Sequence, residues 1–435
     1  MKDDPKKLSL SRRDFMKWTV GGAFSTLLVR SPRLFGTDAA AQNSLFSVSE
    51  IPGNPFYSQR SPNNHAGIDC LLFLMGNNGL KFYRSNVTGP VSGPLGMIAS
   101  NDVVLIKVNA QWKYRGATNS DLVRGLVQAI LSHRDGFTGE IVIFENGQGR
   151  GSLNCDTSAS YSDNLVHANA LNESHSFLYM VDHIFKDSRV SAFLLDPIRD
   201  RFINRDDHVT NGYRILENVS YPCFTTRRGT RVELREGVWN GSGYGQNLKL
   251  INVPVLKTHG GSEITASLKH FYGVLSMNDG NSGYRHYAGL GETCGKMVVS
   301  VRPPVLNLMD AIWVSHESLT GYPASTTFNA NRIVASQDPV ALDYWAAKNI
   351  LYPINKNYNH HPDNATIQDW LYVAQGFINN RGGLYSSQSG ILVDKVSKNE
   401  SEMVVYFDNA TSFIQKGPDT IPREAKDRER RRRKF

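Results

Sequence analysis

The sequence is poor in cysteine and places none of its cysteines close together. Its 435 residues include 4 cysteines, and no Cys-x-x-Cys pair occurs. The pattern therefore predicts neither a zinc knuckle nor an iron–sulfur cluster. Two disulfides of undetermined pairing and buried free thiols are both compatible with this spacing. The cysteines are Cys70, Cys155, Cys223 and Cys294.

A basic face for nucleic acid is also missing from the body of the chain. The formal net charge is +8, but residues 1–41 contribute +4 and residues 421–435 contribute +5, which leaves −1 for residues 42–420. Duplex-binding proteins need a contiguous basic patch. We therefore expect no nucleic acid among the partners. The hydrophobic content of 40% supports a large core and a globular protein.

The apolar stretch near the amino terminus is too short for an ordinary membrane helix. Residues 18–29 fall below the roughly 20 apolar residues that a span needs, and they include Gly, Ser and Thr. The sequence SRRDFMK precedes the stretch at residues 11–17, and three alanines follow at 39–41. This order predicts a twin-arginine signal over residues 1–41. The alternative is a basic amphipathic helix that belongs to the fold.

Export by this route sets the expected location and partners. We expect the twin-arginine translocase as a partner and a periplasmic protein, anchored in the membrane if the signal is not cleaved. Chains exported in this way cross already folded, and many carry a cofactor or a bound partner. The basic tail at 421–435 is expected to be disordered, with a contact to anionic lipid or to an acidic surface as the alternative.

Strand-like and helix-like runs alternate in the body of the chain. Residues 42–101 are expected to form an irregular lead-in, and 102–420 an α/β domain with a β-rich insertion at 199–247. Such alternation predicts a mainly parallel sheet with helices on both faces. The expected strands are 102–108, 140–144, 190–195, 248–256, 306–314, 332–336 and β-like runs within 390–407; the expected helices are 119–133, 162–185, 262–275, one opening at 338–339, and 366–377.

Ligands of open parallel sheets bind beyond the carboxyl ends of the strands. The best candidate there is Lys257-Thr258-His259-Gly260-Gly261, which directly follows an apolar run. Lysine and histidine can hold an anion or transfer a proton, and glycines let backbone N–H groups approach a ligand. A solvated turn is the alternative.

Charged residues inside apolar runs are the second indication of a functional site. Helical spacing places Lys269 over the same loop, and the neighbouring His270 is interpreted as structural. Lys107 lies within an apolar run that ends at Asn109, so it should reach the cleft or meet a carboxylate. Asp310 is also surrounded by apolar residues. We expect Asp310 to share a site with one or more of these lysines; a structural buried ion pair is the alternative.

Other motifs are weaker. Asp338-Pro339 is interpreted as a helix cap followed by proline at the first helical position. The loop at 146–151 (NGQGRG) resembles a phosphate loop but lacks the Rossmann spacing and the P-loop lysine. A divalent metal stays open as a cofactor, although no histidine pair has ligand spacing. The candidate metal ligands are His286, His316, His360, His361, Asp310 and Glu145.

Three segments together resemble a known family. These are NVPVLKTHGGSEITASLKHFYGVLS (252–276), VRPPVLNLMDAIW (301–313) and ASQDPVALDYWAAK (335–348). They resemble the bacterial and archaeal family 362 of domains of unknown function, and residues 103–123 are similar to its amino-terminal strand, loop and helix. The resemblance covers roughly residues 103–351. Positions carried over are Lys107, Asn109, Lys257, Thr258, His259, Lys269, Gly273, Asp310, Asp338 and Asp343.

The resemblance implies a fold but no settled activity. Some members add a ferredoxin-like segment with clustered cysteines, which this chain lacks, so no iron–sulfur cluster is expected. His270 stands where the family's motif often has asparagine. From the residues we predict a crevice for an anionic small molecule, a carboxylate or a phosphate ester, with acid–base chemistry by Lys257, His259, Lys269 and Asp310. The alternative is a non-catalytic ligand-binding protein or an escort for an exported redox enzyme.

Overall fold

The computed structural model describes residues 43–57, 61–157, 163–280, 283–381 and 388–416, all within one compact unit of the chain. The predicted signal at 1–41 and the basic tail at 421–435 lie outside these residues, so export and the role of the tail stay predictions. Over the part described, no helix is long and apolar enough to cross a membrane.

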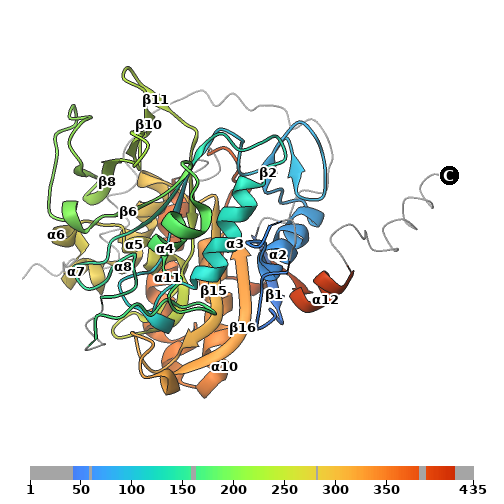
Figure 1. Ribbon diagram of the computed structural model, residues 1–435. Helices are drawn as coiled ribbons and strands as arrows, with labels where there is room; N and C mark the ends of the chain where they lie inside the picture. Colours follow the sequence, from blue (N-terminus) through green and yellow to red (C-terminus); the bar gives the residue numbers. More distant parts are fainter. Residues whose placement is uncertain (1–42, 58–60, 158–162, 281–282, 382–387, 417–435) are drawn as a thin grey trace, which may run out of the picture. The chain divides into compact units, whose positions relative to one another are not determined.

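A ten-stranded sheet organises the described residues (Figure 1). Its strands are β1 (Asn43–Ser49), β4 (Val103–Lys107), β5 (Glu140–Glu145), β6 (Val190–Leu194), β12 (Leu248–Asn252), β13 (Val255–His259), β14 (Glu263–Thr265), β15 (Leu306–Ser315), β16 (Thr327–Ser336) and β17 (Met403–Asn409). The main order is β17-β1-β16-β15-β12-β4-β5-β6, with β13 and β14 attached beside β15. The run from β15 to β6 is parallel, whereas β16 is antiparallel to both neighbours. This confirms the predicted mainly parallel α/β sheet.

The central strands are apolar on both faces. Every residue of β4 and of β5 is buried. Continuous runs of Val, Ile and Leu are typical of parallel strands that helices cover from both sides. Each of these two strands nevertheless ends in a charged residue, Lys107 in β4 and Glu145 in β5. Both charged residues lie at the carboxyl-terminal edge of the sheet.

Val253 and Pro254 interrupt the strand that enters the middle of the sheet. Before them, β12 pairs with both β4 and β15; after them, β13 pairs with β15 and β14. Proline has no N–H to donate to a neighbouring strand. The carbonyl of Val253 instead accepts from Thr118 Oγ1 at 2.8 Å, and that of Pro254 accepts from the N–H of Asp310 at 2.8 Å. The chain therefore leaves β4 at this point and continues beside β15.

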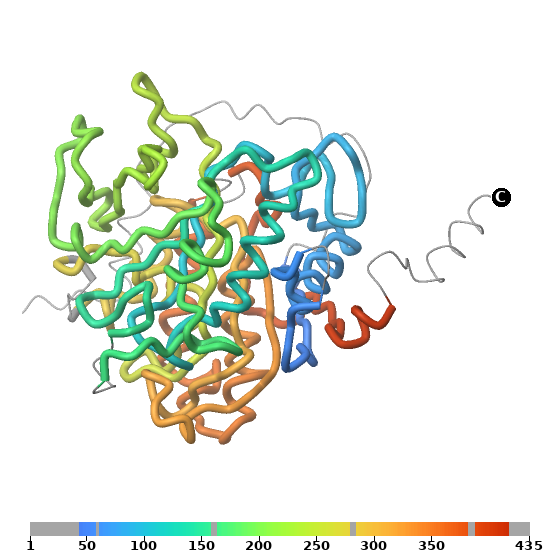
Figure 2. Tube along the Cα trace, viewed as in Figure 1, coloured from blue at the N-terminus to red at the C-terminus, as the bar shows by residue number. Residues whose placement is uncertain are grey.

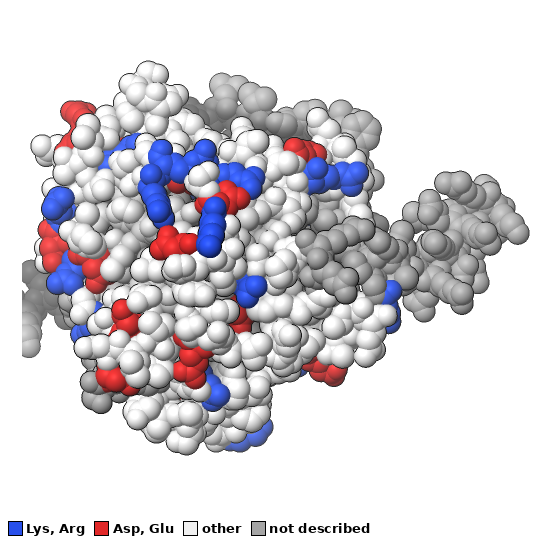
Figure 3. Space-filling view, viewed as in Figure 1, with Lys and Arg blue, Asp and Glu red and all other residues white. Residues whose placement is uncertain are grey.

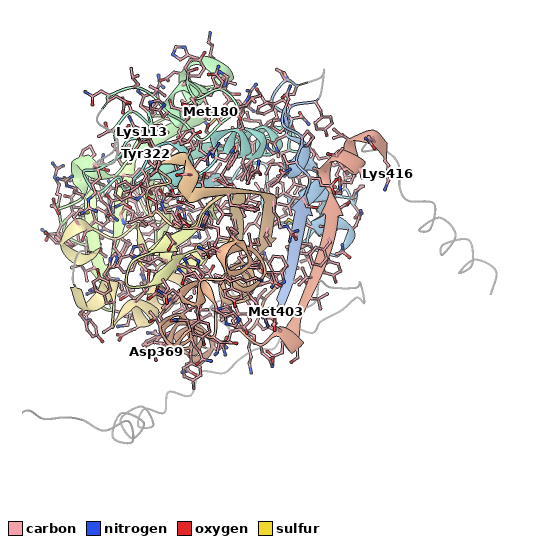
Figure 4. All side chains as sticks on the ribbon, turned by 90° about the horizontal axis from the view of Figure 1, so that it is seen from below. Lys113, Met180, Tyr322, Asp369, Met403 and Lys416 are labelled. Atoms are coloured by element: carbon pink, nitrogen blue, oxygen red, sulfur yellow. The ribbon has the colours of Figure 1, made fainter. Side chains whose placement is uncertain are left out.

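Helices cover both faces of the sheet. One group comprises α2 (Ala66–Asn77), α3 (Ser120–Leu131) and α12 (Ala410–Lys416); another comprises α5 (Ser267–Tyr272), α8 (Leu290–Lys296), α9 (Pro339–Ala346) and α11 (Ala365–Asn380). In Figure 4, Lys113, which precedes α3, is labelled in the upper part of the view and Asp369 of α11 in the lower part. Shorter helices are α4 (Phe177–Tyr179), α6 (Met277–Gly280), α7 (Gly283–His286) and α10 (Tyr352–Asn355).

Side chains cap the starts of two helices, and the cap at Asp338 was predicted. The side chain of Asn119 accepts from the N–H of Leu122 at the start of α3. Asp338 accepts from the N–H groups of Val340 and Ala341 at the start of α9, with Pro339 at the first helical position. Such caps satisfy N–H groups that the helix itself leaves free.

The predicted β-rich insertion is present as a separate antiparallel sheet. Its five strands lie in the order β11-β10-β9-β8-β7. They are β7 (Gly212–Leu216), β8 (Val219–Thr225), β9 (Arg231–Glu233), β10 (Gly237–Trp239) and β11 (Tyr244–Gly245). A two-stranded sheet of β2 (Tyr83–Arg84) and β3 (Ser92–Gly93) lies between α2 and β4 in the chain.

The start of the chain differs from the expected irregular lead-in. Strand β1 lies between β16 and β17 inside the main sheet, and α2 packs against it. Figure 2 shows this early segment in blue beside the red carboxyl-terminal segment. The expectation failed because Pro52, Pro55 and Pro62 mark only the link between these two elements.

Two predicted helices are shorter than their periodicity suggested. The stretch 162–185 is helical only from Phe177 onward, and 262–275 only over Ser267–Tyr272, after the short strand β14.

The four cysteines are all buried and free. On the face drawn in Figure 3, basic and acidic side chains are interspersed.

Candidate functional site

The chain reverses its direction of travel across the sheet between β4 and β12. From β4 it proceeds outward through β5 and β6, and after the insertion it returns to the other side of β4 as β12. Side chains and loops on either side of such a switch point diverge, which opens a crevice at the carboxyl ends of the strands. Here the interruption at Val253 and Pro254 widens the opening, because β13 turns away from β4.

A cavity of about 390 Å³ lies at this switch point. Its polar lining comes from the ends of β4, β5 and β13, from α5, and from the segments around Gln148 and His286. Four basic side chains line it against one carboxylate. The basic residues are Lys107, Arg150, Lys257 and Lys269, and the acidic one is Glu145.

Lys107 and Glu145 form an ion pair at the floor of the cavity. The Nζ of Lys107 lies 2.7 Å from Oε2 of Glu145, and both side chains are 2% exposed. Burial lowers the pKa of Lys107 and raises that of Glu145, while the attraction between the two charges opposes both shifts. A Cβ at Gly273 would come within 3.4 Å of this Nζ, so glycine there leaves the lysine its room.

Lys257 is a buried lysine without a carboxylate partner. Its Nζ donates to the carbonyl oxygen of Gly116 at 2.8 Å, and over the described residues it forms no ion pair. Burial, the largest cause, lowers its pKa from 10.5 to about 7. Gly116 ends a tight turn, Tyr114–Gly116, and a Cβ there would meet the carbonyl oxygen of Thr320 at 2.1 Å. The residue opposite Lys257 is therefore held to glycine by backbone packing.

Lys269 projects from α5 into an aromatic corner of the same cavity. Its Nζ lies 4.4 Å from the centroid of the Tyr272 ring and 3.1 Å from Nε2 of His286. Burial lowers the pKa of Lys269 to about 8. The electron-rich face of a tyrosine ring favours a cation near it. Two lysines of the cavity thus titrate near neutral pH.

Two histidines of the cavity lining, His259 and His270, are kept neutral. Burial, followed by the neighbouring charge of Lys269, lowers the pKa of His259. Burial also lowers the pKa of His270 well below its usual value, and its Nδ1 lies 2.7 Å from Oδ1 of Asn252. A neutral imidazole can accept one proton or donate a hydrogen bond, but adds no charge for an anion.

Asn109 offers a polar group that the fold does not use. It lines the cavity with 7% of its surface exposed, and its Oδ1 is buried without a hydrogen-bond partner among the described residues. Its backbone is fixed by a hydrogen bond from its N–H to Thr118 Oγ1 at 2.8 Å. Buried polar groups of native proteins are usually satisfied, so this amide points to a partner outside the chain.

Three of the predicted site residues lie elsewhere. Thr258 faces away from the cavity, because side chains alternate along β13, and its Oγ1 meets Nε2 of His360 at 3.0 Å. Gly261, at φ +82, packs beneath Tyr287, whereas Gly260 does line the cavity. Asp310 does not line it.

Asp310 is satisfied by backbone N–H groups and not by a lysine. Its carboxylate accepts from the N–H of Asn119 at 2.7 Å and from that of Ile312 at 3.1 Å. Burial raises its pKa to about 7. The structure therefore corrects the prediction that Asp310 orients one of the lysines: Glu145 is the carboxylate that does so.

Backbone N–H groups of the glycine-rich loop at 146–151 are already hydrogen-bonded to another residue of the chain. The N–H groups of Gly147 and Gly149 both donate to the carboxylate of Asp196 at 2.6 Å. Those N–H groups are no longer available to cradle a phosphate. Gln148 and Arg150 of the loop do reach the cavity, and both also line an adjoining open hollow that contains Arg199.

The histidines proposed as metal ligands do not converge. In the described segments, no group of three or more His, Cys, Asp or Glu side chains is arranged to hold a metal ion. His316 lies near Asn355, and His361 stacks on Tyr358. Among the described residues, only His286 of these four lines the cavity.

Sequence reasoning found most of the basic residues but missed part of the lining. The sequence had singled out Glu145 only as a candidate metal ligand; since it ends the strand adjacent to Lys107, the rule that located Lys107 could also have placed it in the cavity. The side chains of Gln111, Tyr272, Tyr287 and Leu319 come from loops and a short helix. No periodic signal marks such positions.

Comparison with known proteins gives a family resemblance for one part of the chain. No curated protein and no solved structure matches the chain. One part of the chain does match a family model, and this part carries Lys257, His259 and Lys269 of the cavity, together with β15 and α9. Residues 246–348 match the family described as Domain of unknown function (DUF362).

Proposed function

We propose that the protein binds an anionic small molecule, a carboxylate or a phosphate ester, in the cavity between β4 and β13. The excess of basic over acidic side chains in the lining supports this proposal. In a partly desolvated site each cation attracts an anion more strongly than in water. Glu145 is already neutralised by Lys107, so the charge left for a ligand is positive.

Lys257 carries the proposal. Among the described residues its Nζ has one hydrogen-bond partner, a carbonyl oxygen, and a buried lysine held in this way is costly to the fold. An anion bound beside its Nζ would supply the missing counter-charge and raise its pKa. Arg150 and Lys269 lie around the same cavity and would share the charge of the ligand.

Lys257 would also serve as the acid or base for a reaction on that ligand. With a pKa of about 7 it exists in both protonation states near neutral pH. The neutral His259 and the amide of Asn109 would orient the ligand through hydrogen bonds. In this proposal Lys107 keeps its position through Glu145 and completes the positive floor.

The test compares two buried lysines by calorimetric titration with inorganic phosphate and with acetate. Lys257→Met removes the cavity lysine. Lys249→Met is the matched control, because Lys249 is equally buried and donates to the carbonyl of Ser389 at 3.0 Å but does not line the cavity.

We expect Lys257→Met to weaken binding at least about tenfold, the loss of one charge-assisted hydrogen bond. Lys249→Met should leave the affinity as it is. Equal affinity in the wild type and Lys257→Met, or an equal loss in both variants, would refute the proposal.

A further inference from the structure

A second cavity, of about 370 Å³, adjoins the Tyr114–Gly116 turn, whose last carbonyl accepts a hydrogen bond from Lys257. Arg115 of the Tyr114–Gly116 turn lines it, whereas the carbonyl of Gly116 faces Lys257. The other walls come from the start of α3, from the outer ends of β15 and β16, and from the residues before α2. No residue lines both cavities.

His65 places an unsatisfied donor in this second cavity. Its ring is 1% exposed, and Nδ1 accepts a hydrogen bond from the N–H of Ile68 at the start of α2, at 3.3 Å. Burial lowers the pKa of His65 to about 3, so the ring is neutral at pH 7. Because Nδ1 accepts, the single ring proton lies on Nε2. This Nε2 has no hydrogen-bond partner among the described residues.

Asp121 and Asn169 supply acceptors in the same cavity. One oxygen of the Asp121 carboxylate accepts from the N–H of Leu171 at 2.6 Å, while the other accepts no hydrogen bond within the described chain. The amide of Asn169 donates to the carbonyl of Ala117 at 3.0 Å, which leaves its oxygen for another donor. Both side chains are less than 5% exposed.

Arg115 balances the carboxylate and is held rigidly. Its guanidinium carbon lies 3.2 Å from the centroid of the Trp313 ring, and one of its nitrogens donates to Thr327 Oγ1 at 2.9 Å. One cation and one anion therefore line the cavity. The remaining walls include Ile51, Leu171 and Ile312, which are apolar.

We propose that this second cavity binds an uncharged, polyhydroxylated small molecule, a sugar or a polyol. The ligand must accept a hydrogen bond from Nε2 of His65 and donate one to Asp121, and a hydroxyl group does both. The balanced charge of the lining favours a neutral ligand, and its apolar walls suit the C–H faces of a sugar ring. The volume lies within the range of about 300–1,000 Å³ that is usual for ligand sites.

In the experiment the full chain is titrated with D-glucose, D-galactose, D-mannose and sorbitol, and binding is detected by saturation-transfer NMR. His65→Asn keeps a side-chain acceptor for the N–H of Ile68 but removes the Nε2 donor. Asp121→Asn keeps the acceptor for Leu171 and replaces the other oxygen with a donor. His361→Asn is the matched control, because Nδ1 of His361 likewise accepts from a backbone N–H, that of Asp363, outside the cavity.

We expect saturable binding of at least one neutral probe, weakened about tenfold by either cavity variant. The control variant should bind as the wild type does. The proposal is overturned if no neutral probe saturates up to about 100 mM, well above a Kd of about 1 mM. It is equally overturned if glucuronate or glucosamine binds more tightly than the neutral sugars, or if both variants bind normally.

Discussion

Lys107 and Glu145 end two adjacent parallel strands, and their side chains meet as a nearly inaccessible ion pair with Nζ and Oε2 2.7 Å apart. The carboxylate also accepts from the N–H of Ala110 at 3.2 Å, so it ties the loop after β4 to β5. A pair in this position fixes where the first lysine of the cavity lies. Among the described residues, Lys257 and Lys269 form no ion pair of their own, although the charge of Glu145 partly opposes the lowering of the Lys257 pKa.

We predict that Glu145→Gln destabilises the protein by about 3–5 kcal/mol, because it leaves Lys107 buried without a counter-charge. Urea-induced unfolding at pH 7 measures the loss. The double variant Lys107→Met/Glu145→Gln is the control and should recover a large part of it, since no buried charge remains. A cost of about 1 kcal/mol or less, as for an exposed ion pair, would contradict this prediction.

The stability of Lys257→Met relative to the wild type should depend on pH. The pKa of Lys257 falls from 10.5 to about 7 on folding, so between those values the unfolded chain binds the proton and the native protein does not. Stability of the wild type therefore rises with pH through this window, by up to about 1.4 kcal/mol per pH unit. Below about pH 7 the full cost of burying the charge is present.

Lys257→Met lacks that cost, so its advantage should be greatest below pH 7 and should shrink as the pH rises towards 10.5. Unfolding curves of both proteins across this range measure the difference. Lys249→Met provides a comparison. Burial lowers the pKa of Lys249 only to about 8, so its contribution to stability begins to change with pH only above about pH 8. A difference that is constant with pH would contradict the prediction.

Sulfate binding should be coupled to proton uptake. Sulfate keeps its charge near neutral pH, so any pH dependence belongs to the protein. At about pH 8 Lys257 is mostly neutral and Lys269 half protonated, and an anion draws protons onto both. Calorimetry in buffers of different ionisation enthalpy should show uptake at about pH 8 and almost none at about pH 6. Buffer-independent heats at both pH values would contradict the assignment.

Asp343 should give the opposite pH dependence. It accepts from the N–H groups of Ser267 and Leu268, at 2.7 and 3.0 Å, and so caps the helix that carries Lys269. Burial raises its pKa from 3.8 to about 7. Between these values the native protein holds a proton that the unfolded chain has lost, so stability falls as the pH rises.

Asp343→Asn removes this titration, and its unfolding free energy should change less between pH 4 and 7 than that of the wild type. The amide of the variant leaves one backbone N–H group unsatisfied. At low pH the unfolding free energy of the variant should therefore be about 1–3 kcal/mol lower than that of the wild type. Thermal or urea unfolding at both ends of the range checks the prediction. Parallel curves for the two proteins would contradict it.

The sheet was largely predictable because its signals are local. Runs such as VVLIK and EIVIF are long enough to mark buried strands, and Asn119 and Asp338 mark helix starts by their side-chain chemistry. Strand β1 was not predicted, because NSLFSVS is short, only partly apolar and followed directly by the proline-rich link at 52–62. Its place in the sheet depends on β16 and β17, which are almost 300 and 360 residues away.

Part of the cavity lining could also be predicted, because its signals in the sequence are local. Lys107 and Lys257 could be placed because a charge within or just after an apolar run is conspicuous, and the strand ends meet at one edge. Which carboxylate pairs with which lysine depends on strand order, and sequence alone does not give that order. Asp310 lies on β15 beside β13, where its carboxylate faces the start of α3; Glu145 lies on β5 beside β4.

The interruption of the strand at Val253 and Pro254 has a consequence for how this scaffold could be altered. The opening between β4 and β13 is made by the main chain, through a proline that lacks an N–H and a strand that keeps β15 as its neighbour. Side chains of similar size could replace the whole lining without closing it. Folding therefore does not require lysines there, and apolar substitutes would be more stable. The same backbone could be refitted for a different ligand by changing the lining residues at the ends of β4, β5 and β13, on α5 and in the adjoining loops.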